Sequence, residues 1–306
     1  MTVPDLAGLP LQIRPLEAAA VERLVNGCFP VEQGASFFDD FPAWTSEGAL
    51  WLGACDEKGF VGAAAGALPG EWLLGADGGS ITIVRIGGVV THERWRSRGL
   101  ASDLVGALVG HATGAGAEAC VLWGEDSPLY RRLGFEPLGR QLRIPLSALV
   151  SEVDRASAVL RIEEGFSGDV FLAMNESRRE WGGVLLSAAD GELIPKHRHT
   201  RWARVLDGQG RLAGYGAFGK GIDLGLQLHE WGGTREAIRA VGRWALAIDP
   251  RAEIMGNQPR LESAFGELPR ESLVEPLCLA RVPDPALRSR LGARERQLWF
   301  WGLDGA

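Results

Sequence analysis

Residues 84–108 read VRIGGVVTHERWRSRGLASDLVGAL: an apolar strand, a polar loop, and then an apolar segment with helical spacing. The loop enters the helix through Arg96-Ser97-Arg98-Gly99-Leu100-Ala101. The first amides of a helix have no partner inside it and carry partial positive charge, which suits a bound anion. Gly99 has no Cβ, so a pyrophosphate could approach the backbone there. The spacing alone leaves an ordinary basic loop equally open, but the placement between a strand and a helix favours a phosphate site.

Two better-known phosphate sites do not fit this loop. It lacks the Gly-Lys-Ser/Thr of the P-loop, and it lacks the three glycines and the later acidic residue of the dinucleotide-binding fingerprint. If the loop binds a phosphate, it therefore does so as neither of these two motifs.

Strands and helices alternate on both sides of this loop. Period-two and helical patterns of apolar residues predict strands at residues 11–16, 49–55, 60–68, 80–90, 119–123 and 138–144, and helices at residues 18–29, 99–113 and 128–133. The sequence therefore predicts an α/β fold with a mixed sheet for the first half of the chain.

The second half repeats this order. A polar stretch, SEVDRAS at residues 151–157, is the best linker. The strand–turn–strand of residues 49–68 then recurs at residues 201–220, and a strand at 224–230, a helix at 234–248 and a strand at 252–256 follow. The sequence therefore predicts tandem α/β domains, 1–150 and 151–306, each a mostly antiparallel mixed sheet flanked by helices.

The composition is that of a globular protein without a membrane span. The chain has 306 residues, of which 46% are hydrophobic and 23% charged, with a net charge of -7. No apolar run approaches the roughly 20 residues that cross a bilayer, and no secretory signal is evident, so we expect a cytoplasmic protein. The negative charge argues against nucleic acid or an anionic membrane as the main partner. The sequence leaves a homo-oligomer open.

The cysteines and histidines show no metal-binding pattern. The four cysteines, Cys28, Cys55, Cys120 and Cys278, form no C-x-x-C pair and lie among apolar residues, so we expect buried free thiols. His197 and His199 are two residues apart, without an evident third ligand. We expect no metal.

A second motif lies roughly thirty residues beyond the loop, where residues 122–139 read LWGEDSPLYRRLGFEPLG. Together, VVTHERWRSRGLA and LYRRLGF resemble the cofactor segment and the late Tyr motif of the GNAT superfamily of acyl-CoA-dependent N-acetyltransferases. The form around Leu122-Trp123 and Tyr130 resembles the enhanced-intracellular-survival type more closely, since the commonest GNAT pattern has Asn at the position of Trp123. That type also carries a second, degenerate GNAT-like domain. It usually ends in a sterol-carrier-like domain, for which this chain is too short.

The resemblance implies roles for named residues. Backbone groups of Val89, Val90 and Thr91 would contact the pantetheine arm and acetyl carbonyl of acetyl-CoA. The loop from Arg96 to Ala101 (Arg96, Ser97, Arg98, Gly99, Leu100 and Ala101) would hold the pyrophosphate. Tyr130 would protonate the departing thiolate, a role that suits a phenol. The implied activity is transfer of an acetyl group to a primary amine of a small molecule or peptide.

The sequence does not identify the base that takes the amine proton. Candidates near the expected site are Glu32, Asp39, Asp40, His92, Glu93 and Glu125, and in relatives of the survival type the C-terminal carboxylate, here that of Ala306, can take this role. Because no base stands out, a non-catalytic acyl-CoA sensor is the alternative.

The second half has neither motif. No Arg-x-x-Gly-x-Ala separates its strand from its helix, and no late Tyr motif follows, so we expect it to bind no CoA. Its tryptophans could line an acceptor cleft or belong to the core; these are Trp231, Trp244, Trp299 and Trp301.

Overall fold

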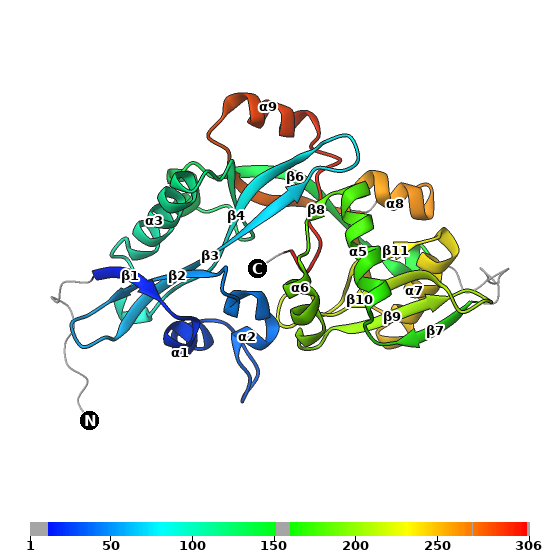
Figure 1. The fold of residues 1–306 in the computed structure, drawn as a ribbon, viewed down its shortest axis with the longest axis horizontal. Helices are drawn as coiled ribbons and strands as arrows, with labels where there is room; N and C mark the ends of the chain where they lie inside the picture. The colour runs from blue at the N-terminus through cyan, green and yellow to red at the C-terminus, as the bar shows by residue number, and fades with distance from the viewer. Residues whose placement is uncertain (1–11, 151–159, 271, 305–306) are drawn as a thin grey trace.

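The computed structural model describes residues 12–150, 160–270 and 272–304 (Figure 1). Two predictions concern other residues, the linker at residues 151–157 and the place of the Ala306 carboxylate. Within the described ranges, no helix is long and apolar enough to cross a membrane.

The first half follows the predicted order. Its elements are β1 (Gln12–Leu16), α1 (Ala18–Cys28), α2 (Phe37–Asp40), the 3₁₀ helix η1 (Pro42–Thr45), β2 (Leu50–Cys55), β3 (Val61–Leu73), β4 (Ser80–Thr91), η2 (Glu93–Trp95), α3 (Leu100–Gly114), β5 (Ala119–Leu122), α4 (Pro128–Arg132), β6 (Glu136–Pro145) and η3 (Leu146–Ala148). The largest difference is in β3, which we predicted to end at Leu68. Pro69 does not end it, because the strand stays in register with β4, with Pro69 opposite Val84.

The second half repeats most of these elements. They are β7 (Arg161–Glu164), α5 (Gly168–Trp181), β8 (Gly183–Val184), α6 (Ala188–Leu193), η4 (Ile194–Lys196), β9 (Arg201–Leu206), β10 (Leu212–Phe218), β11 (Gln227–Gly233), α7 (Arg235–Ile248), β12 (Glu253–Gly256), α8 (Gln258–Phe265), β13 (Leu273–Arg281) and α9 (Pro285–Ala293). The units β4–α3–β5 and β11–α7–β12 correspond, since in each a helix connects two parallel strands.

All these strands belong to one 13-stranded sheet among the described residues. Its order is β1-β2-β3-β4-β5-β13-β6-β12-β11-β10-β9-β7, with β8 paired to β3. Only β4–β5 and β11–β12 are parallel pairs. The predicted mostly antiparallel mixed sheet flanked by helices is confirmed.

The last strand of each half crosses to the other half. β13 lies between β5 and β6 and is antiparallel to both, with Leu279 opposite Leu122 and Val274 opposite Leu142. β6 pairs on its other side with β12, where Ile144 lies opposite Ile254. The halves therefore share one continuous sheet, in place of the separate sheet that we predicted for each.

Alternate side chains of β4 face two different layers. Val84 and Ile86 pack under α3, whose apolar stripe includes Leu104 and Leu108. Ile81, Ile83 and Arg85 face the opposite side. On that side the C-terminal segment of the chain reaches the middle of the molecule, between the halves (Figure 1).

The structure tests the predicted burial of the second-half tryptophans and of the four cysteines. Of the tryptophans, Trp231, Trp299 and Trp301 are buried and Trp244 is half-buried, so they belong to the core. The prediction that every cysteine is buried is wrong for Cys28, which is exposed. Cys28 follows Val21 and Val25 on one helical face, but it is the last residue of α1 and a cavity opens beside it.

Candidate active site

Strands β4 and β5 separate before β4 ends. Their parallel pairing runs from Ile83 with Ala119 to Ile86 with Leu122. β4 continues to Thr91 in contact with β3 alone. Among the described residues, the free edge of residues 87–91 has no strand partner, and its backbone groups can pair with a ligand.

A β-bulge lies at this point in β4. The register with β3 shifts between Ala64 and Gly66, so that β4 has one more residue than its partner. Gly88 has a φ of 57°, and a Cβ there would lie 2.4 Å from the Trp51 ring. Only glycine meets both conditions without strain. The bulge places Val89 toward the α3 layer and Val90 toward the layer that contains α1.

The loop after β4 turns sharply into α3. Ser97 and Gly99 both have positive φ, 62° and 80°. Gly99 is the N-cap of α3, and a Cβ added there would have one neighbour within 4 Å, Asp103 Oδ2 at 4.0 Å. The space beside Gly99 is therefore open, and the first amides of a 15-residue helix point into it.

A cavity of about 260 Å³ lies at this helix start. Thr91 lines it together with the predicted loop residues 96–101. Trp95 also lines it, and its buried indole N–H has no hydrogen-bond partner among the described residues. From α4 come Leu129 and Arg132, which the sequence did not single out. Arg132 adds a guanidinium to those of Arg96 and Arg98, so the cavity suits an anion.

The predicted site residues thus fall into two groups. Thr91, Arg96, Ser97, Arg98, Gly99, Leu100 and Ala101 line the cavity, whereas Val89 and Val90 lie further along the free edge of β4. Tyr130 is on α4 between Leu129 and Arg132, half-buried, with its ring edge-on to Phe135 at 6.1 Å. Burial raises the pKa of Tyr130, so its hydroxyl stays protonated at neutral pH.

Three of the base candidates have structural partners, and two of them, Asp40 and Glu32, join the two halves. Asp40 is fully buried and accepts from Arg198 Nε at 2.8 Å and from Nη2 at 3.1 Å. Glu32 approaches the same guanidinium at 3.4 Å. Asp39 accepts the backbone N–H of Ser36 in a capping box. Each of these carboxylates already has a structural partner.

The other candidates lie apart from them. His92 and Glu93 line a separate cavity of about 790 Å³, between α1 and the β2–β3 turn, which meets the first cavity at Arg96. Cys28 also lines it, and burial raises the pKa of its thiol, against the opposing charge of Arg96. Glu125 is exposed after β5. The geometry therefore selects none of the candidates as the base.

Metal ligands are not gathered anywhere in the described part of the chain. No group of three or more His, Cys, Asp or Glu side chains there could hold a metal ion.

Residues 18–135 match the family model for the acetyltransferase (GNAT) family. Similar solved structures include a probable N-acyltransferase from Enterococcus faecalis V583 (TM-score 0.63, 15% identity, covering 89% of this chain and 72% of that chain). A GCN5-related N-acetyltransferase from Anabaena variabilis has a TM-score of 0.64 at 15% identity, covering 89% of this chain and 73% of that one. Eis1 from Mycobacterium abscessus has a TM-score of 0.57 at 18% identity, covering 92% and 75%.

These likenesses show a shared fold over most of the chain. No curated protein matches the sequence. Residues 18–135, which hold the bulged strand, the loop and Tyr130, therefore form an acetyltransferase domain of the GNAT family.

Proposed function

We propose that the chain is an acetyl-CoA-dependent N-acetyltransferase acting on a primary amine of a small molecule or peptide. The observation that carries the proposal is the cavity in which Thr91, loop residues 96–101 and Arg132 meet. It joins a free strand edge to a helix N-terminus and three guanidinium groups, a combination that suits a long thioester carrying a pyrophosphate.

The residues fit acetyl-CoA both in the cavity and along the strand edge that reaches it at Thr91. The open space beside Gly99 admits a pyrophosphate to the amides of α3. The free edge of residues 87–91 offers backbone groups to the amides of a pantetheine arm. When bound, acetyl-CoA supplies the acetyl thioester that the amine attacks.

Tyr130 would act as the general acid. As the amine nitrogen bonds to the acetyl carbon and the carbon–sulfur bond breaks, the sulfur needs a proton. The phenol of Tyr130, whose pKa is raised by burial, holds that proton at neutral pH. The amine must lose a proton in turn, to a base that this structure leaves open.

Calorimetry with acetyl-CoA tests the cavity. The wild-type chain should bind, and Gly99→Glu should not, because its carboxylate would occupy the pyrophosphate position. Gly110→Glu, on the same helix with nothing within 4 Å of the added Cβ, is the matched control and should bind normally. Equal affinity for wild type and Gly99→Glu would refute the assigned site. A panel of amino acids, polyamines, aminoglycosides and peptides, scored by release of free thiol, then tests transfer.

A second candidate function, an acyl-CoA sensor, draws on one observation. Asp40 and Glu32 both pair with Arg198, so two of the base candidates already have a structural role. A sensor would bind acetyl-CoA with the same dependence on Gly99 but release no thiol with any amine.

A further inference from the structure

The C-terminal segment, residues 298–304, is buried between the two halves although it comes last in the chain. Trp299, Phe300 and Trp301 each expose 1% or less of their surface, and Asp304 exposes 1%. Such burial requires contacts with both halves.

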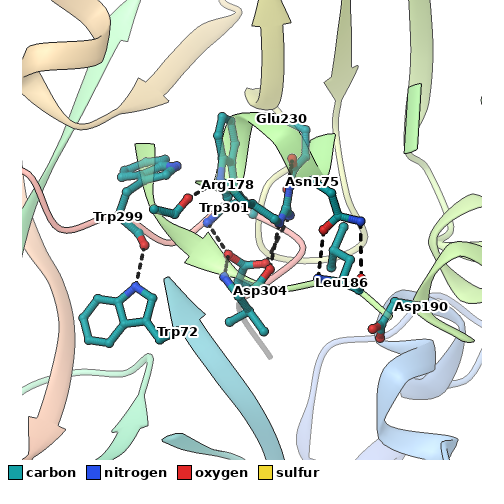
Figure 2. A network of polar contacts seen from close by, with 12 residues as sticks. Trp72, Asn175, Arg178, Leu186, Asp190, Glu230, Trp299, Trp301 and Asp304 are labelled. Atoms are coloured by element: carbon teal, nitrogen blue, oxygen red, sulfur yellow. Dashed lines mark hydrogen bonds and ion pairs between the residues drawn. The ribbon is translucent and has the colours of Figure 1, made fainter. Parts of the chain in front are cut away.

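Toward the first half the contacts are mostly apolar. The Phe300 ring stacks on Trp72 of β3 at 4.2 Å and meets Trp123 edge-on at 5.0 Å. The indole of Trp72 donates to the Trp299 carbonyl at 2.9 Å (Figure 2). Arg85 Nη1 on β4 donates to the Asp304 carbonyl at 3.3 Å.

Two of these contacts, those with Trp123 and Arg85, lie near the point where β4 and β5 separate. Trp123 directly follows the last residue of β5, and Arg85 lies in the last stretch of β4 that pairs with β5. Arg85 faces away from α3, whereas the loop cavity lies at the start of α3. The segment therefore borders the same strand separation as the proposed donor site, from the opposite face of the sheet.

Toward the second half Trp301 packs on Trp231, and a buried ionic network lies beside it. Arg178 of α5 donates through Nη2 to Asp304 Oδ1 at 3.1 Å (Figure 2). The Val184 N–H donates to Asp304 Oδ2 at 2.9 Å. Arg178 also binds both carboxylate oxygens of Glu230 in β11, at 2.9 and 3.1 Å. None of the three charged side chains is exposed.

Arg178 is the centre of this network. It lies between two buried carboxylates, and burial raises the pKa of Glu230 to about 7 even with the guanidinium beside it. A buried ion group of this kind adds little stability compared with apolar packing, but its directional bonds fix one arrangement. The arrangement that it fixes is the position of Asp304.

We infer that Arg178 is a positioning residue: it holds the C-terminal segment, through Asp304, against the place where β4 and β5 separate. The second half would thereby complete the active site without binding cofactor. The effect on catalysis rests on the proposed function, whereas the holding of the segment does not.

Carboxypeptidase digestion of the full-length chain, followed by intact mass measurement, tests the holding directly. In the wild type, trimming should stop with Asp304 still present. In Arg178→Met it should continue past Asp304 toward Trp299. Arg179→Met, an exposed neighbour on α5, and Val205→Ala, a core change in β9, are controls that should stop where the wild type does. Trimming of Arg178→Met no further than these controls would overturn the inference.

A second variant guards against misfolding of Arg178→Met. Asp304→Asn leaves the Arg178–Glu230 pair balanced, so the second half should fold, yet it removes the charge that holds the segment. It should also be trimmed past residue 304. Arg178→Lys keeps one positive charge and should be trimmed less than Arg178→Met.

Turnover of the most reactive amine in the panel tests the catalytic side. Arg178→Met should keep the acetyl-CoA Kd within about 2-fold but lower kcat about 10- to 100-fold, the range expected when a reacting group is misplaced by about 1 Å. Val205→Ala should keep its kcat. An Arg178→Met variant that is trimmed yet turns over normally would overturn the positioning role. A wild type without turnover would instead refute the proposed function, and the trimming would still decide the holding.

Discussion

The guanidinium of Arg260 lies 4.3 Å from the centre of the Trp231 ring and 4.0 Å from that of Trp301. Trp231 is on β11 and donates its indole N–H to the Met255 carbonyl on β12. The Trp231 side chain thus bridges β11 and β12. In the first half the corresponding parallel strands, β4 and β5, separate. A cavity of about 140 Å³ lies beside the start of α7, and Arg260 borders it.

These contacts predict that the second half binds no CoA. Calorimetry of the wild type with acetyl-CoA should give one site per chain, and Gly99→Glu should leave none. Residual binding by Gly99→Glu that is lost on Trp231→Ala would show that the second half has a site after all.

Tyr130→Phe should keep cofactor binding and lose turnover. The phenol supplies a proton that phenylalanine lacks, and general acid catalysis is worth about 10²- to 10⁴-fold. We expect an unchanged acetyl-CoA Kd and a kcat that is lower by about 100-fold or more. Turnover equal to that of the wild type would remove Tyr130 from the mechanism.

Arg132→Met should weaken the binding of acetyl-CoA. Arg132 lines the cavity, whereas its neighbour Arg131 pairs with Asp126 away from it, so Arg131→Met is the matched control. Loss of one charge-assisted hydrogen bond to a phosphate raises Kd about 10-fold. Titrations at two salt concentrations should show a smaller salt dependence for Arg132→Met than for the control. Equal affinities would place the phosphates elsewhere.

Sequence reasoning located the loop because its signals are local. A strand, a glycine with positive φ and a helix start are specified within residues 84–108, and all of them are present. The pairing of β13 between β5 and β6 left no such signal, since it depends on contacts between residues more than a hundred positions apart. One sheet in place of two could not be read from patterns within each half.

The site residues that belong to one local motif were predictable, whereas those that depend on tertiary contacts were not. Thr91 and the loop residues came from one motif and line one cavity. Leu129 and Arg132 were missed because their role depends on which side of α4 faces α3. Asp40 was a base candidate by its position in the sequence, and its burial against Arg198, from the other half of the chain, could not be foreseen.

Acidification should destabilise the fold through two buried histidines. Burial and the ammonium of Lys220 lower the pKa of His197 to about 4 and that of His229 to about 3. In the unfolded chain both take up a proton near pH 6.5. Below that pH the unfolded state binds more protons than the folded state. The contribution of these two histidines to the free energy of unfolding is therefore complete above pH 6.5 and is lost as the pH falls toward 4.

The comparison with His229→Gln isolates one of these groups. Glutamine can still donate to the Gly219 carbonyl, as His229 Nε2 does at 3.0 Å, but it does not titrate. Between pH 6 and 4 the free energy of unfolding of the wild type should fall faster than that of the variant by about 1.4 kcal/mol per pH unit, the value for one proton. The raised pKa of Glu230 has the opposite effect on the free energy of unfolding between pH 4.5 and 7. Because Glu230 is present in both proteins, its effect cancels in the comparison. Urea unfolding at several pH values measures the difference, and parallel curves would mean that His229 is not held neutral by the fold.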